Sequence, residues 1–231
     1  MKKRKLEPED MDDPDLEAGH HLEALKGLVW LNRWSVSGVE MFRSLRRFRN
    51  GALKDLRVLD VASGGGDVPL TVARLALRSG LNWEVHGCDR SETAAAFANA
   101  EAGRGGLPVR FFNLDIQKEN LPRDYDVLTN SLFLHHLTRV ETIRFLRKMA
   151  EAARSGIVIH DLERSRIGLF LAFLMGRLVT RSKVVHHDAP QSVRASYTLR
   201  EIRRLAAKAG LTGASVERCW PFRYRLVWRK A

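Results

Sequence analysis

The chain of 231 residues is poor in cysteine and has no long apolar run. Its two cysteines, Cys88 and Cys219, lack C-x-x-C spacing, which excludes a disulfide framework and a cysteine-built zinc cluster. The longest apolar stretch, residues 167–179, is interrupted by Arg177 and is shorter than the roughly 20 residues of a membrane-spanning helix. Because the basic residues 1–5 lead into acidic residues and not into an apolar run, we expect no signal peptide. These absences predict a cytoplasmic protein.

Acidic residues are also scarce relative to basic ones, 27 against 39, which gives a formal net charge of +12. Such a balance raises nucleic acid or a membrane surface as a partner. The arginines recur, however, at the spacing expected for the solvent-exposed faces of amphipathic helices. This spacing makes nucleic acid an unlikely partner. These arginines are Arg43, Arg46, Arg47, Arg49, Arg144, Arg147, Arg200, Arg203 and Arg204.

One glycine-rich stretch, residues 58–69, reads V-L-D-V-A-S-G-G-G-D-V-P. A strand-like run enters it at residues 56–61, and an apolar helix pattern leaves it from Pro69. Three successive glycines permit positive φ and let a ligand approach the main chain. Asp67 is expected to cap the following helix, with Pro69 in its first turn. The pattern is typical of a ligand-binding crossover in a parallel sheet.

Strand and helix patterns alternate from residue 56 onward, which predicts an α/β protein with a mostly parallel sheet and helices on both faces. The last two strands are separated by a turn too short for a crossover helix, so we expect them to pair as antiparallel neighbours. The predicted strands are residues 56–61, 83–88, 109–113, 125–130, 156–161, 213–220 and 223–229. The predicted helices are residues 68–79, 92–102, 139–153 and 198–209.

Two helical patterns, residues 16–31 and 39–48, precede the sheet and form an N-terminal extension over residues 1–52. We expect this extension to pack across the ligand end of the sheet, the alternative being a pair of helices that covers a sheet face. Residues 1–15 lack periodicity and are expected to be disordered or loosely attached.

Acidic side chains follow the strands, where ligands bind in such sheets. Asp89 follows the second strand and Asp115 the third, while the fourth leads into residues 130–137. A dinucleotide oxidoreductase would use the glycines and Asp89, but its G-x-G-x-x-G fingerprint is absent. Moreover, Asp60 and Asp67 flank the loop, which suits a cationic, amino-acid-like ligand better than a diphosphate.

These motifs, in this order, resemble those of class I S-adenosylmethionine-dependent methyltransferases, in particular the small-molecule enzymes related to the ubiquinone and menaquinone methylases. The first motif of that family runs acid-x-Gly-x-Gly-x-Gly, and residues 60–66 match it with Ala62 in place of the first glycine. The resemblance covers residues 53–230. It implies S-adenosyl-L-methionine as cofactor and a Rossmann-like sheet of seven strands, mostly parallel with an antiparallel terminal strand.

The resemblance also implies roles for single residues. Asp89 would hold the ribose hydroxyls with Arg90 beside the adenine, and Asp115 would accept from the adenine amino group with Ile116 against the ring. The remaining cofactor contacts would come from the loop and from the end of the fourth strand near the methionine part, namely Asp60, Ala62, Ser63, Gly64, Gly66, Asn130 and Ser131. Structural alternatives stay open for three acids: Asp60 as a cap of loop N–H groups, Asp89 as a helix N-cap and Asp115 as a turn residue.

Methyl transfer from a sulfonium is an in-line displacement, so a base helps only if the acceptor must lose a proton. His135 and His136 follow the fourth strand and are the base candidates, the alternative being a histidine that caps the next helix or packs on the loop. His160 and Asp161 form a second candidate pair. Residues 186–188, His-His-Asp, lack a third ligand at suitable spacing, so we predict no metal site.

The acceptor class is narrowed by a missing motif. Amine methylases of nucleic acids with this fold typically carry an Asn- or Asp-Pro-Pro-aromatic motif after the fourth strand, whereas residues 130–133 read N-S-L-F. An insertion at residues 164–196 carries an apolar helix that would either roof the acceptor pocket, favouring a lipophilic or aromatic substrate, or belong to ordinary core packing. Basic residues around it also suit peripheral contact with an anionic membrane surface.

Three further segments, residues 11–17, 31–35 and 187–198, resemble small bacterial methyltransferases of polyketide or isoprenoid-quinone pathways. This resemblance implies O- or C-methylation of a phenol, pyrone or quinol type compound. The alternatives are an NAD(P)-dependent oxidoreductase and a nucleic-acid-directed methyltransferase. Residues 53–231 are thus predicted to be a methyltransferase domain, and the oligomeric state stays open.

Overall fold

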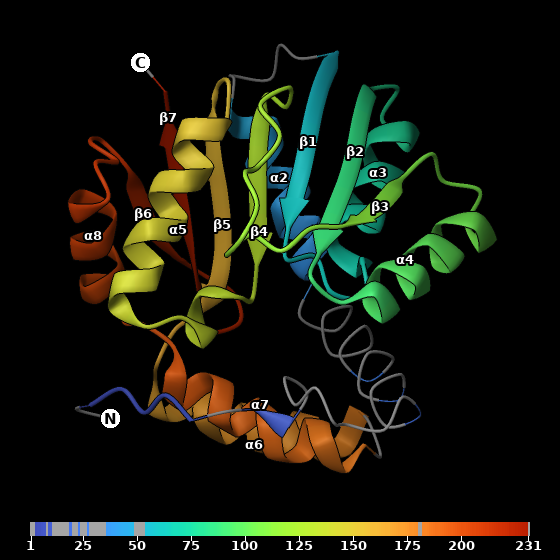
Figure 1. The fold of residues 1–231 in the computed structure, drawn as a ribbon. Helices are drawn as coiled ribbons and strands as arrows, with labels where there is room; N and C mark the ends of the chain where they lie inside the picture. The colour runs from blue at the N-terminus through green and yellow to red at the C-terminus, as the bar shows by residue number, and fades with distance from the viewer. Residues whose placement is uncertain are drawn as a thin grey trace.

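The computed structural model of the chain describes residues 3–7, 9–10, 19, 23, 27, 36–48, 54–179 and 182–230. A seven-stranded sheet with the order β3-β2-β1-β4-β5-β7-β6 forms its centre (Figure 1). Neighbouring strands among β1 to β5 pair in parallel, while β7 runs antiparallel to both β5 and β6. The strands are β1 (Asp55–Val61), β2 (Asn82–Asp89), β3 (Arg110–Asn113), β4 (Val127–Ser131), β5 (Gly156–Leu162), β6 (Ser215–Cys219) and β7 (Arg223–Arg229).

Helices cover both faces of this sheet (Figure 1). Successive side chains of a strand point to opposite faces, and accordingly Val58 and Leu59 of β1 belong to two different hydrophobic clusters. One cluster joins the sheet to α2, α3 and α4, and the other joins it to α5 and α8. The helices are α2 (Ser37–Phe48), α3 (Asp67–Arg78), α4 (Glu92–Arg104), α5 (Arg139–Ala152), α6 (Arg166–Val179), α7 (Lys183–Ala195) and α8 (Leu199–Lys208), with a short 3-10 helix η2 (Leu134–His136).

The predicted α/β fold is confirmed, including the parallel core and the antiparallel pair at the end of the chain. The predicted helix over residues 39–48 is α2, which contacts α3 and β5 and therefore covers a sheet face, the second of the two expected arrangements. The helix predicted over residues 16–31 lies outside the described residues.

The insertion at residues 164–196 contains two helices, α6 and α7, that lie side by side below the carboxyl ends of the parallel strands (Figure 1). Its two ends are held together by Arg164, whose buried guanidinium donates to the Ser196 carbonyl oxygen at 2.8 Å and to Glu201 at 3.0 Å. Because α7 also contacts η2, the insertion lies next to the loop that follows β4. Among the described residues, no helix has the length and apolar character needed to cross a membrane.

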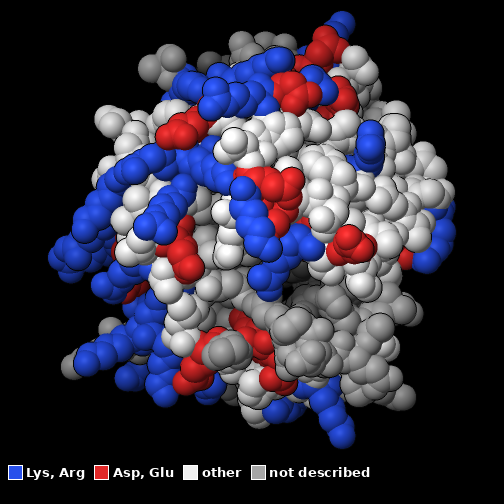
Figure 2. Space-filling view, in the orientation of Figure 1, with Lys and Arg blue, Asp and Glu red and all other residues white. Residues whose placement is uncertain are grey.

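Basic side chains are spread over the surface and are mixed with acidic ones in the view of Figure 2. All the arginines assigned to wet helix faces are exposed where the structure describes them, as on α5 and α8; Arg49 lies outside the described residues. This distribution is that of solvated helices and not of a single basic stripe.

Candidate active site

The loop between β1 and α3 turns through residues with positive φ: Ala62 at 55°, Gly64 at 50° and Gly66 at 76°. Ala62 thus adopts the left-handed conformation although it carries a Cβ. A Cβ added at Gly64 would meet no heavy atom within 4 Å outside its chain neighbours, whereas one at Gly66 would lie 2.6 Å from Phe111 Cζ. Gly64 therefore leaves the main chain open to a ligand, and Gly66 permits close packing.

The N-terminus of α3 differs in one detail from the sequence prediction. The N-cap is Gly66 and not Asp67, which is the first residue of the helix, while Pro69 lies in the first turn as predicted. Gly66 has no side chain to cap the helix, so the glycine loop and the positive end of the helix dipole meet here. Such an end favours ligand groups that accept hydrogen bonds.

Asp89, at the end of β2, binds the glycine loop directly. Its Oδ2 accepts from the Gly64 N–H at 2.8 Å, and its Oδ1 accepts from the Ser91 N–H at 2.9 Å. The N-cap of α4 is Ser91, whose Oγ accepts from the Ala94 N–H. Asp89 is therefore not the helix N-cap, and since a carboxylate offers about four acceptor positions, it retains capacity for ligand hydroxyls.

Asp60 is buried in β1, and its Oδ1 accepts from the Thr129 hydroxyl at 2.6 Å. Burial raises the pKa of this carboxyl to about 7, the Thr129 hydrogen bond opposes that rise, and the charges of Asp67 and Asp89 add to it. The structural alternative was that the Asp60 carboxyl caps N–H groups of the glycine loop. Among the described residues no hydrogen bond from a loop N–H to Asp60 is present. The carboxyl instead joins β1 to β4.

Asp115 lies in the turn after β3, where its Oδ1 accepts from the Gln117 N–H at 2.9 Å. This hydrogen bond lowers the pKa of Asp115 below its ordinary value, and Lys118 adds to the effect. Asp115 is thus a turn residue in the described structure, with its carboxylate at the surface. The neighbouring Ile116 packs against the hydrophobic cluster under α5, and Arg90 lies in the adjacent loop between β2 and α4.

Two buried polar atoms at the end of β4 have no hydrogen-bond partner among the described residues: Asn130 Oδ1 and Ser131 Oγ. The amide Nδ2 of Asn130 donates to the Val61 carbonyl oxygen at 2.7 Å, which fixes this side chain beside the glycine loop. Buried polar groups in folded proteins are nearly always hydrogen-bonded. The two orphaned atoms therefore fit a polar ligand group between the ends of β1 and β4.

His135 and Asp161 form a buried pair where β4 and β5 end. His135 Nδ1 lies 2.7 Å from Asp161 Oδ1, and both side chains are at most 4% exposed. Burial would raise the pKa of Asp161, but the charge and hydrogen bond of His135 and the N–H of Leu162 lower it below its ordinary value. The carboxylate therefore fixes the imidazole and leaves Nε2 as its second functional nitrogen.

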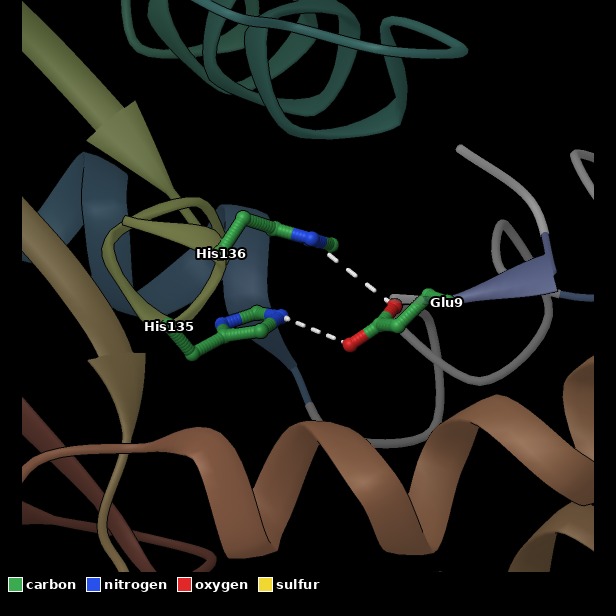
Figure 3. A group of neighbouring side chains, drawn as sticks. All are labelled: Glu9, His135 and His136. Atoms are coloured by element: carbon green, nitrogen blue, oxygen red, sulfur yellow. Dashed lines mark ion pairs between the residues drawn. The ribbon is translucent and has the colours of Figure 1, made fainter. Parts of the chain in front are cut away.

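That second nitrogen faces Glu9, a residue from the N-terminal segment (Figure 3). Glu9 is buried, with Oε1 at 3.8 Å from His135 Nε2 and Oε2 at 3.9 Å from His136 Nε2. The two histidine rings are tilted by 34° against each other, with centroids 4.3 Å apart. The two nitrogens of His135 thus face one carboxylate each, Asp161 at Nδ1 and Glu9 at Nε2.

The N-terminal segment is held against the site by further contacts. Arg4 donates to the carbonyl oxygen of His135 at 2.7 Å and to the hydroxyl of Tyr197 at 2.8 Å, while the Ser192 hydroxyl donates to Glu9 at 2.7 Å. The expectation of a loosely attached start is therefore wrong for residues 3–7 and 9–10. Sequence analysis missed Glu9 and Arg4 because a segment without hydrophobic periodicity gives no signal of where it docks.

The second predicted pair, His160 with Asp161, does not form. Adjacent residues of a strand point to opposite faces, so His160 turns to α2, where its Nε2 lies 3.0 Å from Ser44 Oγ. Burial, together with Arg223 and Arg225, lowers the pKa of His160 to about 3. Its imidazole is therefore neutral, and it lies on the face of β5 away from His135.

Two groups of side chains bring three possible metal-ligand atoms within 4.8 Å of one another. One is Glu9 with His135 and His136, and the other is Asp10 with His187 and Asp188. The fold thus supplies Asp10 as a third ligand to the His-His-Asp segment, which sequence spacing did not show. In both groups the same atoms already form ion-pair contacts, so the geometry is explained without a metal.

One family model and several solved structures resemble this chain. Residues 58–156 match the family model described as "Methyltransferase domain". No curated protein matches the chain. Solved structures resemble it at low sequence identity. Human N-acetylserotonin methyltransferase in complex with S-adenosylmethionine has a TM-score of 0.68 and 17% identity over 93% of this chain and 57% of its own.

Two bacterial structures extend the comparison. An S-adenosylmethionine-dependent methyltransferase from Aquifex aeolicus has a TM-score of 0.62 and 18% identity over 94% of this chain and 100% of its own. An O-methyltransferase family 2 protein from Planctomyces limnophilus, in complex with apigenin, has a TM-score of 0.55 and 19% identity over 76% of this chain and 50% of its own. The chain thus spans little more than half of the human enzyme and half of the Planctomyces protein.

Residues 58–156 thus match a methyltransferase domain, and the chain shares its fold with S-adenosylmethionine-dependent methyltransferases. The predicted resemblance to methyltransferases and the predicted fold are therefore confirmed.

Proposed function

We propose that the protein methylates a small lipophilic or aromatic acceptor at oxygen or carbon, of the phenol, pyrone or quinol type, and that His135 removes the acceptor proton. The observation that carries this proposal is the buried pair of His135 and Asp161 at the carboxyl ends of β4 and β5. Ligands of parallel sheets bind at this edge. A base is of use only for an acceptor that must lose a proton, which phenols and enols do.

The cofactor is proposed to lie along the carboxyl ends of β1, β2 and β4. The open main chain at Gly64, the carboxylate of Asp89 and the orphaned atoms Asn130 Oδ1 and Ser131 Oγ support this placement. When bound there, the cofactor supplies an electrophilic methyl group on a sulfonium sulfur. The residues proposed to hold it are Asp60, Ala62, Ser63, Gly64, Gly66, Asp89, Arg90, Asp115, Ile116, Asn130 and Ser131.

The proposed step moves one proton. The acceptor O–H would give its proton to Nε2 of His135, which would leave the acceptor oxygen, or the enol carbon, as the nucleophile for the methyl group that the bound cofactor would supply. Asp161 at Nδ1 and Glu9 near Nε2 stabilise the imidazolium that results. His136, whose Nε2 lies 3.9 Å from Glu9 Oε2, is the second candidate base.

The acceptor is proposed to enter from the side of the insertion at residues 164–196, which lies below the proposed site (Figure 1). The Planctomyces structure holds apigenin, and the human enzyme is named for N-acetylserotonin, which supports a small molecule as acceptor. We propose that the chain consists of an N-terminal extension, residues 1–52, and a methyltransferase domain, residues 53–231. We also propose peripheral contact of the protein with a membrane surface.

The test measures turnover of a panel of phenols and quinols of increasing alkyl length. Release of S-adenosylhomocysteine is the readout. We expect turnover with at least one alkylated acceptor and loss of most of it in His135→Ala. Titration calorimetry with S-adenosylhomocysteine and with NAD serves as the companion measurement. Activity restricted to RNA or DNA, with no turnover of any phenol or quinol by the parent or by His135→Ala, would overturn the proposed acceptor class.

A further inference from the structure

The exposed face of α6 carries an unusual amount of apolar surface. Of ten large hydrophobic side chains that are exposed among the described residues, five belong to this helix, with exposures between 39% and 71%. They recur at helical spacing on one side: Ile167, Phe170, Phe173, Leu174 and Leu178. Contiguous exposed apolar patches on soluble proteins mark interaction sites.

The other side of α6 is the one that packs. Gly176 approaches Val185 and Ala189 of α7, and Ala172 joins the small hydrophobic cluster formed by those two residues. Small residues at this contact bring the helices close, which leaves the large side chains of α6 pointing away from the protein. Of the two alternatives for this helix, ordinary core packing therefore describes only the face toward α7.

Basic groups border the apolar face. A cavity of about 370 Å³ lies between α6 and α7. Among the described residues its lining holds Phe173, Pro190 and the basic or imidazole side chains of Arg177, Lys183, Arg194, His186 and His187, with no acidic side chain. Arg177 stacks on the Phe173 ring at 3.7 Å and donates to the Phe173 carbonyl oxygen, which holds its guanidinium at the border between cavity and apolar face. Two acids, Asp10 and Asp188, contact His187 at the edge of this cavity.

We propose that α6 docks on a membrane that contains acidic phospholipid, with its apolar face among the acyl chains and a lipid phosphate in the basic cavity between α6 and α7. An amphipathic helix with cations at the boundary of its apolar face is suited to this interface. Charge complementarity decides the partner. A second copy of the chain docked on this face would bring Arg166, Arg177 and Lys183 close to the same positive charges of its partner. A nucleic acid would leave the five apolar side chains without apolar contacts.

This inference rests on the proposed function, because it gives a lipophilic acceptor a route from the bilayer. The helix pair α6–α7 lies below the carboxyl ends of the strands, and α7 contacts η2, which carries His135 and His136 (Figure 1). Docking through α6 would therefore set the proposed acceptor site over the membrane surface. At 14 residues, α6 lies in the interface and does not span it.

The experiment is flotation of the full chain with vesicles of a zwitterionic phospholipid, with or without an acidic phospholipid. We expect flotation with the acidic vesicles, weakening as salt is raised. The double variant Phe170→Glu/Leu178→Glu is expected to reduce partitioning roughly tenfold or more. The matched control is Leu77→Glu/Val140→Glu, which places the same charges on α3 and α5 at positions 62% and 58% exposed, and it is expected to float like the parent.

Equal flotation of the α6 variant and the control would overturn the proposal, and so would binding that ignores acidic lipid. A parent chain that sediments as a dimer, with the α6 variant a monomer and no flotation of either, would assign the face to a second copy. Thermal melting of both double variants checks that they fold. Turnover of a short-chain, water-soluble phenol separates this proposal from the proposed function. A folded α6 variant that fails to float is expected to retain turnover of that phenol. Absence of all phenol turnover in a parent that floats would overturn the proposed reaction and leave the membrane proposal standing.

Discussion

His135 Nδ1 lies 2.7 Å from Asp161 Oδ1, and the pair is buried between two strands that are adjacent in the sheet. In the sequence the residues are 26 positions apart, and the sequence pattern paired Asp161 with its neighbour His160 instead. The strand pleat brings them together and turns His160 away. The geometry gives the proposed base a fixed tautomer and an acid that stabilises its charged form.

Replacing His135 by alanine should lower turnover of a phenolic acceptor by roughly a hundredfold to ten-thousandfold, because general base catalysis contributes about that much. Affinity for S-adenosylhomocysteine, measured by calorimetry, should stay nearly unchanged. Asp161→Asn should also lower turnover, since the amide no longer stabilises the imidazolium. His136→Ala is the matched control, with a smaller expected loss. Equal losses in the two histidine variants would assign the pair to positioning and not to proton transfer.

Asp89→Ala should weaken cofactor binding by roughly 1.5 to 3 kcal/mol, because it removes charge-assisted hydrogen bonds. Isothermal titration with S-adenosylhomocysteine measures the loss. Asp89 also accepts from the Gly64 and Ser91 N–H groups, so thermal melting without cofactor is needed to separate binding from loop order. Unchanged affinity in the Asp89 variant would leave this residue a purely structural role.

Asp60 should make stability depend on pH. Its pKa is raised from 3.8 to about 7, so between these values the native state binds a proton that the unfolded state has released. The free energy of unfolding should therefore fall as pH rises through this window, by at most about 1.4 kcal/mol per pH unit. Above about pH 7 this contribution stays constant. Urea unfolding of the parent and of Asp60→Asn at several pH values in this window measures the free energy of unfolding. The variant should lack the part of the pH dependence that Asp60 contributes.

His160 acts in the opposite direction over an overlapping range. Its pKa is lowered from 6.5 to about 3, so the unfolded state binds the additional proton and stability should fall as pH drops below 6.5. Only the difference between parent and variant at each pH isolates Asp60. Asp55→Asn, an exposed substitution on the same strand, serves as control. If the Asp60 and Asp55 variants keep the parent's pH profile, Asp60 ionises at its ordinary pKa.

Removal of metal should leave turnover and stability unchanged. Glu9 and the two histidines are satisfied by their mutual contacts, by Ser192 and by Asp161, and Arg4 places a cation on the carbonyl oxygen of His135. The measurement is metal analysis and turnover before and after dialysis against a chelator. One firmly retained divalent ion per chain, lost together with activity and absent from Glu9→Gln, would contradict the prediction.

The sequence by itself determined the fold. Strand-like apolar runs alternate with helical patterns, and these local signals give the strands and most helices from residue 55 onward with small shifts at their ends, whereas α7 was not predicted. The glycine loop and the acids after the strands could be found for the same reason, because their signals lie within a few residues of each strand. The cap of α3 was misassigned, since Gly66 and Asp67 are both acceptable there and only the loop path decides between them.

Tertiary structure decided which side chains meet. His135 finds Asp161 across neighbouring strands, and Glu9 reaches His135 from a segment with no periodic pattern. Whether α6 is a core helix or an exposed one was also undecided by its composition, because an apolar helix reads alike in both settings. Its packing on α7 through small residues turns the large side chains outward. Contacts of this kind depend on strand order and on the docking of distant segments, neither of which is encoded in a local run of residues.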